Sequence, residues 1–201
     1  MNHWWFLKLQ LVLFTIIILS IGGLRSQNAE GLALSDCAIS LTEQSVRYDP
    51  SYFSIPYPGG DVPSDRGVCT DVVIRAYRGM GIDLQVDVHE DMRRHFAVYP
   101  QLWGLSRPDP NIDHRRVPNL MTFFHRHEAE LPISELAADY WPGDVVSWSL
   151  GGAITHIGIV VDRWSEDGER PLIVHNIGAG QVLEDCLFRY KIIGHYRFQP
   201  W

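Results

Sequence analysis

Hydrophobic and polar residues follow a helical period in the middle of the chain. From residue 69 to residue 81 the apolar residues recur every three to four positions, which places them on one side of a helix, and glycines end the pattern. Similar patterns predict helices over residues 89–99 and 117–127. We therefore expect Cys69 in the first turn of an amphipathic helix.

The last third of the chain changes to a strand-like period. Runs of β-branched and aromatic residues, separated by Gly, Pro and acidic turns, cover residues 144–150, 156–164, 172–177 and 192–198. Runs so close together predict an antiparallel meander. Helices followed by strands indicate an α+β fold, in which the helix that begins at Cys69 packs on the sheet.

The N-terminus carries an apolar stretch from Leu9 to Leu24 that is typical of an export segment. We expect residues 1–25 to be a signal peptide or an uncleaved membrane anchor, because the stretch is close to the length that spans a bilayer. Residues 26–46 are expected to form a linker with a short helix, and residues 47–201 the folded domain. The domain should face the periplasm or cell envelope, with membrane attachment only through the N-terminal segment.

Composition narrows the classes of function. The 201 residues, 46% of them hydrophobic, can form one compact domain with its own core. The formal net charge of −7 offers no basic field for nucleic acid phosphates. We expect no nucleic acid partner, no cofactor, and a protein that acts as a monomer.

Three polar positions could together carry nucleophilic chemistry. A helix start favours the thiolate of Cys69, and His156 opens a strand on which Gly158 leaves room for close approach. His175 and Asn176 follow on the next strand, and alternation lets only one of them point at His156, so both remain candidates for orienting its ring. A buried cysteine or a hydrogen-bonded histidine is common by itself, but nucleophile, base and orienting residue occur here in chain order.

Two segments around the cysteine resemble a known signature. Pro56-Tyr-Pro-Gly-Gly60 and Gly67-Val-Cys-Thr-Asp71 are similar to the motif of NlpC-type peptidoglycan hydrolases, which belong to the papain-like superfamily. Residues 142–146, 156–160 and 173–176 resemble the strands of those enzymes. The chain departs from the pattern at Thr70, where a serine is usual, and in a shorter spacing after Tyr57.

The chain resembles the domain-of-unknown-function 1287 family more closely, over roughly residues 48–198. The segments that carry this resemblance are residues 111–118, 156–160, 175–178 and 194–197.

These resemblances imply a papain-like cysteine peptidase or amidase that acts on peptidoglycan stem peptides. They imply Cys69 as nucleophile, His156 as general base and acid, and His175 as the orienting residue. They also imply that Tyr57 lies beside the nucleophile and helps to bind the substrate.

Arg115 and Arg116 form an adjacent cationic pair next to a polar loop. Guanidinium groups suit the carboxylates of stem peptides, so we consider Asp113 and Arg115 as substrate-binding candidates. A structural salt bridge between Arg115 and Asp113 explains the same residues equally well. His195 is expected to be a hydrogen-bonded core residue.

Other hypotheses remain open. An oxidising compartment would allow Cys37 and Cys186 to form a disulfide, leaving Cys69 as the free thiol. The domain could also bind cell-wall peptides or a partner without turning them over. Cys69, His156 and His175 could in principle bind zinc, but the chain lacks H-E-x-x-H and C-x-x-C spacing, so we expect no metal site.

Overall fold

The computed structural model describes residues 28–199. The export segment predicted over residues 1–25 lies outside this range. None of the helices in the described part is both long and apolar enough to cross a membrane.

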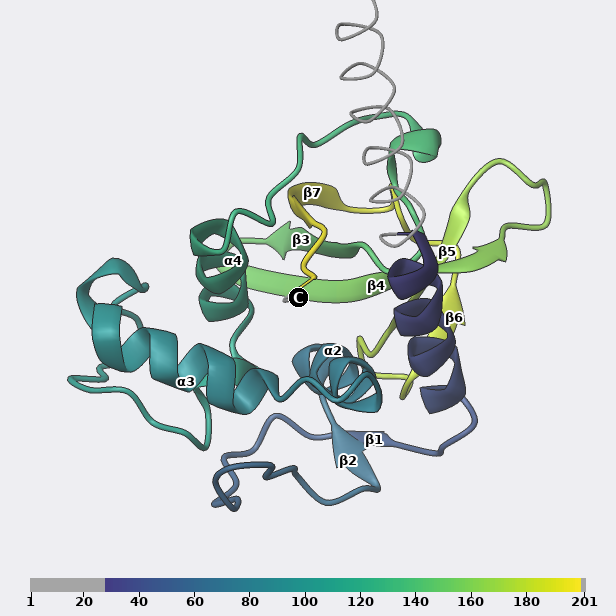
Figure 1. The fold of residues 1–201 in the computed structure, drawn as a ribbon. Helices are drawn as coiled ribbons and strands as arrows, with labels where there is room; N and C mark the ends of the chain where they lie inside the picture. Colours follow the sequence, from purple (N-terminus) through teal and green to yellow (C-terminus); the bar gives the residue numbers. More distant parts are fainter. Residues whose placement is uncertain (1–27, 200–201) are drawn as a thin grey trace, which may run out of the picture.

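A five-stranded antiparallel sheet forms the centre of the fold, in the order β6-β5-β4-β3-β7 (Figure 1). The strands are β3 (Val145–Gly151), β4 (Ile154–Trp164), β5 (Pro171–His175), β6 (Val182–Glu184) and β7 (Lys191–Tyr196). Strands β3, β4 and β5 pair in chain order as the predicted meander requires, whereas β7, expected as its last strand, pairs with the free side of β3. The sequence pattern did not predict β6, which has only three residues.

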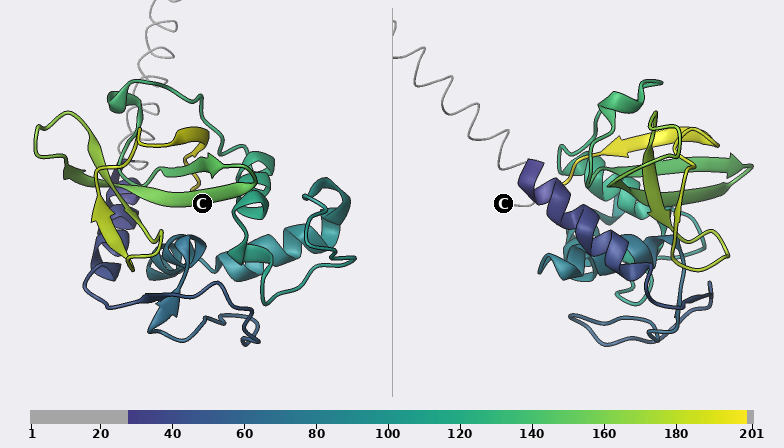
Figure 2. Two further views of the ribbon diagram at one scale, coloured as in Figure 1. Left: turned by 180° about the vertical axis from the view of Figure 1, so that it is seen from behind. Right: turned by 90° about the vertical axis from the view of Figure 1, so that its right-hand side faces the viewer.

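Helices cover one face of this sheet (Figures 1 and 2). They are a helix over residues 28–41, α2 (Cys69–Gly79), α3 (Leu84–His95) and α4 (Val117–Arg126). Short 3₁₀ turns occur at η1 (Phe96–Val98), η2 (Asp113–Arg115) and η3 (Ala137–Asp139). Beyond α2, β1 (Arg47–Tyr48) and β2 (Arg66–Gly67) form a small parallel pair. The α+β class is therefore confirmed.

Alternation along β4 divides the core in two. Ile157, Ile159 and Val161 pack against the helices. Val160 faces the other side and packs with Trp148. Because successive side chains of a strand point to opposite faces, His156 shares the face of Val160 and Trp148, away from the helix layer.

Several helix boundaries differ from the predicted ones. The helix expected over residues 89–99 begins at Leu84, because the Asp83 carboxylate caps it by accepting a hydrogen bond from the Gln85 N–H at 3.1 Å. Residues 28–41 are helical and bury Leu34, Ala38 and Leu41 in the core. The folded unit thus includes residues ahead of the expected boundary near residue 46.

His195 lies in the core, as expected. Its Nε2 lies 2.8 Å from the Asp144 carboxylate, and its ring stacks on Tyr140 with centroids 4.3 Å apart. Arg197 also donates to Asp144, so the buried carboxylate is fully paired.

Candidate functional site

Cys69 is the first residue of α2 and lines an open cleft of about 400 Å³. The Asp71 side chain closes the turn before it by accepting a hydrogen bond from the Val68 N–H at 2.7 Å. Other residues around the cleft are Tyr48, Tyr52, Trp103, Arg115, Arg116 and Thr155. The predicted position of Cys69 at a helix start is confirmed.

The thiol of Cys69 is held in its protonated form. Burial raises its pKa to about 12. Peptide N–H groups of Ile157, Thr70 and Cys69 itself act in the opposite direction, because each stabilises a thiolate. The expected lowering by the helix start is therefore present but outweighed, since the sulfur is largely removed from water.

Arg115 is fully engaged by the protein. Its Nε and Nη2 donate to the two oxygens of Asp71 at 2.8 and 3.0 Å, and both side chains are almost completely buried. Its Nη1 donates to the Ser51 carbonyl at 3.1 Å. The salt bridge expected with Asp113 is thus made with Asp71, and Arg115 holds the turn that carries Cys69.

Asp113 does not line the cleft. One of its carboxylate oxygens accepts from the Asp109 N–H at 2.8 Å and lies 2.9 Å from His89 Nδ1. Burial raises the pKa of Asp113. The residue organises the polar segment that precedes α4 rather than a surface open to substrate.

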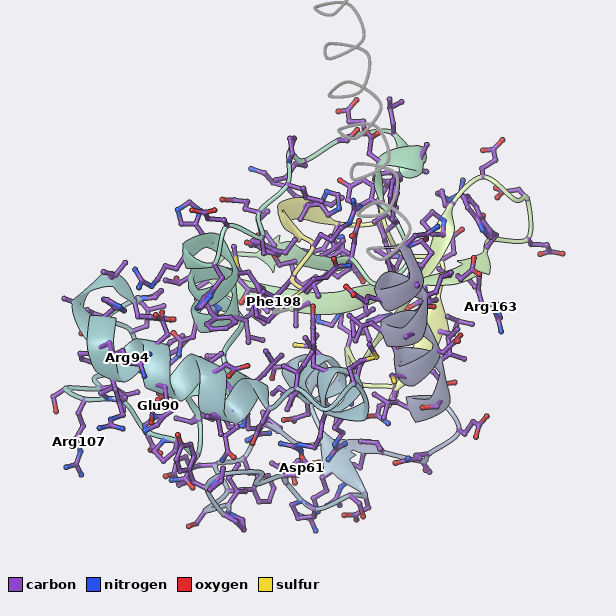
Figure 3. The ribbon with its side chains drawn as sticks, in the orientation of Figure 1. Asp61, Glu90, Arg94, Arg107, Arg163 and Phe198 are labelled. Carbon is purple, nitrogen blue, oxygen red and sulfur yellow. The ribbon has the colours of Figure 1, made fainter. Side chains whose placement is uncertain are left out.

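Tyr57 lies at α3, away from the nucleophile. Its hydroxyl donates to Glu90, labelled on α3 in Figure 3, at 3.0 Å, and its ring meets His89 edge-on. The structure therefore does not bring Tyr57 beside Cys69. Tyr48 lines the cleft instead; burial raises its pKa, and the negative charge of a Cys69 thiolate would act in the same direction. No motif in the sequence marks Tyr48, since it reaches the cleft only through the β1–β2 pairing.

The two predicted histidines are both buried and contact each other, and the hydrogen bonds continue to a partly exposed Glu184. His156 Nε2 lies 2.9 Å from His175 Nδ1, and His175 Nε2 lies 2.9 Å from a Glu184 oxygen. Gly158 lets β4 and β5 pack closely here, because a Cβ there would lie 2.7 Å from the Ile173 side chain and 3.1 Å from the Cβ of His175. Glu184 comes from β6, the strand that the sequence pattern did not predict.

Of the two residues that the sequence offers as partners of His156, only His175 contacts it. His175 contacts His156, whereas Asn176 donates to the Gly67 carbonyl at 3.1 Å and so fixes the segment before Cys69. An ionised Glu184 can only accept, so His175 donates from Nε2 and accepts from the His156 Nε2–H at Nδ1. This arrangement leaves Nδ1 of His156 as a free lone pair.

Burial also keeps both imidazoles neutral. It lowers the pKa of His156 to about 3, with a further contribution from His175. Burial likewise lowers the pKa of His175, against the opposing effect of Glu184. Burial opposes ionisation of Glu184, but hydrogen bonds from Arg189 and His175 bring its pKa below the usual value.

Cys69 and His156 are neighbours without a direct bond between their side chains. The sulfur lies at the peptide N–H of Ile157, the residue that follows His156, while the His156 ring points to the sheet face of Trp148. No hydrogen bond in the described part of the chain joins Cys69 to His156 or His175. The structure thus brings the two histidines together and places the thiol at the adjacent peptide unit.

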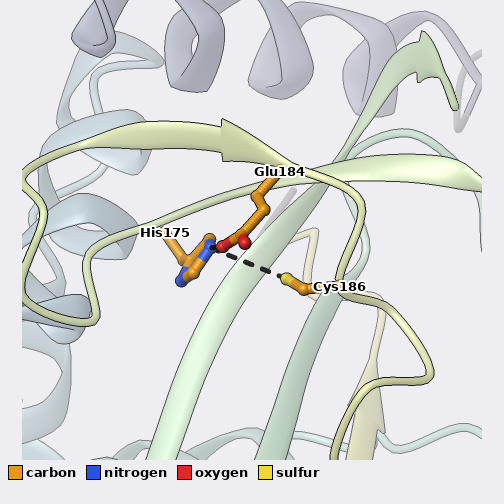
Figure 4. A group of neighbouring side chains, drawn as sticks. All are labelled: His175, Glu184 and Cys186. Carbon is orange, nitrogen blue, oxygen red and sulfur yellow. Dashed lines mark hydrogen bonds and ion pairs between the residues drawn. The ribbon is translucent and has the colours of Figure 1, made fainter. Parts of the chain in front are cut away.

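Cys186 lies beside His175, and its Sγ is 3.6 Å from His175 Nε2 (Figure 4). The ligand atoms of His175, Glu184 and Cys186 lie within 4.8 Å of one another, a spacing that could hold a metal ion. Glu184 is already paired with Arg189, however, and His175 with His156. The Cys69, His156 and His175 set considered from the sequence does not form such a group within residues 28–199.

The disulfide considered between Cys37 and Cys186 is not formed, because Cys37, Cys69 and Cys186 are all free. Cys37 packs close to Gly79 at the end of α2, where even a Cβ on the glycine would lie 2.8 Å from its sulfur. Cys186 lies instead at the sheet face that carries His175. Both cysteines therefore serve packing in different parts of the core.

Comparisons with known proteins match nearly the same part of the chain as the described fold, residues 28–199. A protein-family profile described as "Domain of unknown function (DUF1287)" matches residues 35–198. The "Uncharacterized protein YijF" of Escherichia coli (strain K12) is 54% identical over 167 residues, which cover 83% of this chain and 81% of that protein.

The buried pair of Arg115 and Asp71 gives a direct prediction for stability. Arg115→Gln leaves the Asp71 carboxylate buried without its partner, so the free energy of unfolding should fall by about 3–5 kcal/mol. Urea denaturation followed by circular dichroism measures the change. The control Arg93→Gln removes a solvent-exposed pair with Glu90 and should cost less than about 1 kcal/mol. Equal losses in the two variants would contradict the proposed role of Arg115.

Proposed function

The chain belongs to the domain of unknown function 1287 family, and from this premise we propose that it is an exported papain-like cysteine hydrolase that cleaves amide bonds in peptidoglycan. One observation carries the proposal. Cys69 begins a helix, lines an open cleft and has three peptide N–H groups at its sulfur. It lies next to a strand whose His156 is hydrogen-bonded to His175, which in turn bonds to Glu184.

Further features support the papain-like assignment and the substrate class. A cysteine at the start of a helix packs on an antiparallel sheet, and two consecutive strands supply the histidines, in the order that the NlpC-type resemblance implies. The apolar N-terminal stretch supports export, and export supports a cell-wall substrate. Endopeptidase and amidase reactions use the same chemistry, so the proposal covers both.

In the proposed reaction the resting groups are a neutral thiol and a neutral imidazole. The step requires the His156 ring to turn from the Trp148 face of the sheet toward Cys69 when substrate binds, so that its Nδ1 accepts the thiol proton as the sulfur attacks the amide carbon. Peptide N–H groups at the helix start stabilise the oxyanion. The C–N bond breaks as His156 returns the proton to the leaving amine, and water then releases the acyl group and restores the thiol.

The alternative is a domain that binds cell-wall peptides without cleaving them. The protonated, buried thiol and the missing hydrogen bond between Cys69 and His156 favour this function. Both functions require binding of cell-wall peptides, but only the hydrolase releases products. Product release by the intact protein therefore distinguishes them.

Cys69→Ala should abolish the release of soluble fragments from purified sacculi. The expected loss is at least about 1000-fold, because the attacking atom is removed while the fold is kept. Liquid chromatography with mass spectrometry measures the fragments. Cys37→Ser is the matched control, because it removes a partly buried thiol outside the cleft and should retain activity. Binding of sacculi without release by the unmodified protein would support the binding domain instead.

The pH dependence of the reaction should lack an acid limb near the usual histidine pKa. His156 has a lowered pKa of about 3, so as the pH falls from 8 to 5 its lone pair stays available and kcat/KM should stay nearly constant. Initial rates on a soluble stem peptide test this. A decline with an apparent pKa near 6.5 would show that the base titrates as an exposed imidazole and would contradict the buried, neutral state of His156.

Glu184 should act as a positioning residue through His175. Glu184→Ala removes the acceptor that fixes the His175 tautomer, so kcat should fall by about 10- to 100-fold with little change in KM. Long-range ¹H–¹⁵N spectra of the imidazoles should show that His156 no longer carries its proton on Nε2 alone.

Two further variants distinguish this role from a loss of packing. Glu184→Gln keeps a carbonyl acceptor and should restore most of the rate and the tautomer. Asp185→Ala removes the neighbouring carboxylate, which pairs with Arg170, and should leave both unchanged. An unchanged His156 tautomer in Glu184→Ala would exclude the positioning role.

A further inference from the structure

Arg116 borders the Cys69 cleft and forms no salt bridge with any of the described residues. Its guanidinium carbon lies 4.1 Å from the ring centroid of Trp103, which also lines the cleft. None of its side-chain N–H groups donates a hydrogen bond to a residue in the range 28–199. This contrasts with the adjacent Arg115, whose guanidinium donates to both oxygens of Asp71 and to the Ser51 carbonyl.

The acidic residues nearest to Arg116 are already in use. Asp109 accepts hydrogen bonds from the Tyr52 hydroxyl at 3.0 Å and from Asn111. Asp113 is held by His89 and by the Asp109 N–H. Both carboxylates act on Arg116 only at longer range, as part of its electrostatic surroundings. The N–H groups of the Arg116 guanidinium are therefore available to hydrogen-bond a group that enters the cleft.

The walls around Arg116 are aromatic and accessible. Tyr48, Tyr52 and Trp103 all line the cleft and remain 40–58% exposed. Stacking on Trp103 fixes the plane of the guanidinium while leaving its N–H edge free to meet a planar anion. Such an edge matches a carboxylate in the two-point geometry that favours arginine over lysine.

We propose that Arg116 binds a carboxylate of the substrate, so that the Cys69 cleft selects acidic peptides with a free carboxylate close to the scissile amide. This inference rests on the proposed function and names the feature by which the same cleft recognises its substrate. Arg115, which the sequence suggested for this task, supports the nucleophile turn, and its neighbour Arg116 provides the free guanidinium.

Binding to the inactive Cys69→Ala protein tests the proposal without turnover. The probe is a stem peptide released from sacculi, prepared as the free acid and with its carboxyl groups converted to carboxamides. Isothermal titration calorimetry should show at least tenfold tighter binding of the free acid. Adding Arg116→Gln should remove this preference, and Arg116→Lys should restore only part of it, since an ammonium keeps the charge without the fork.

Arg163→Gln is the matched control, because it removes the same charge from an exposed arginine. Arg163 lies near the end of β4 opposite to Thr155, and Figure 3 shows it at the outer edge of the molecule. Its side chain bonds only to the neighbouring Asp162 carbonyl. The preference for the free acid should be unchanged in this variant.

Three results would overturn the proposal. They are equal binding of the two peptide forms, retention of the preference after Arg116→Gln, and an equal loss for both forms, which would make Arg116 a support for the Trp103 loop. Digestion of sacculi by the unmodified protein is measured in parallel. Digestion without a carboxylate preference rejects this inference alone, whereas a preference without digestion rejects the hydrolase and leaves carboxylate recognition in place.

Discussion

The buried pair of Arg115 and Asp71 is the interaction on which the site depends. Asp71 lies in the first turn of α2, where its carboxylate accepts hydrogen bonds from Arg115 and from the Val68 N–H. The same carboxylate therefore fixes the start of the helix and holds it next to Arg115, which lines the cleft. A buried ion pair is stable only when its hydrogen bonds are satisfied, and the Ser51 carbonyl takes a remaining donor. The position of Cys69 follows from this closed set of bonds.

Burial also decides the chemistry that the site can perform. The low exposure that fixes Cys69, His156 and His175 keeps the thiol protonated and the imidazoles neutral. Among the hydrogen-bonded residues His156, His175 and Glu184, only Glu184 is charged, and a hydrogen bond from Arg189 stabilises its carboxylate. A catalytic cycle built on these groups must therefore move the proton during the attack rather than start from a preformed ion pair. In the proposed function, recognition therefore falls to the cleft rim, where Tyr48, Tyr52 and Trp103 are exposed and Arg116 is partly exposed.

Local sequence patterns predicted much of the framework. The period of apolar residues gave α2 and its start at Cys69, and β-branched runs gave the strands of His156 and His175, because these features depend on neighbouring residues. The features that the sequence did not predict depend on contacts between residues far apart in the chain. The partner of Arg115 lies 44 residues away, the short strand β6 is recognisable only through its pairing with β5, and Tyr48 reaches the cleft through β2. The free thiols of Cys37 and Cys186 likewise follow from their separation across the core.

The most direct test of the central claim is to trap the covalent intermediate. The unmodified protein is mixed with soluble stem peptides, quenched in acid within milliseconds to seconds, and analysed by intact-mass and peptide-mapping mass spectrometry. The account predicts an acyl adduct, equal in mass to the peptide fragment on the carbonyl side of the cleaved amide, on the peptide that contains Cys69. Product formation without an adduct on Cys69, or an adduct on Cys37 or Cys186, would contradict it.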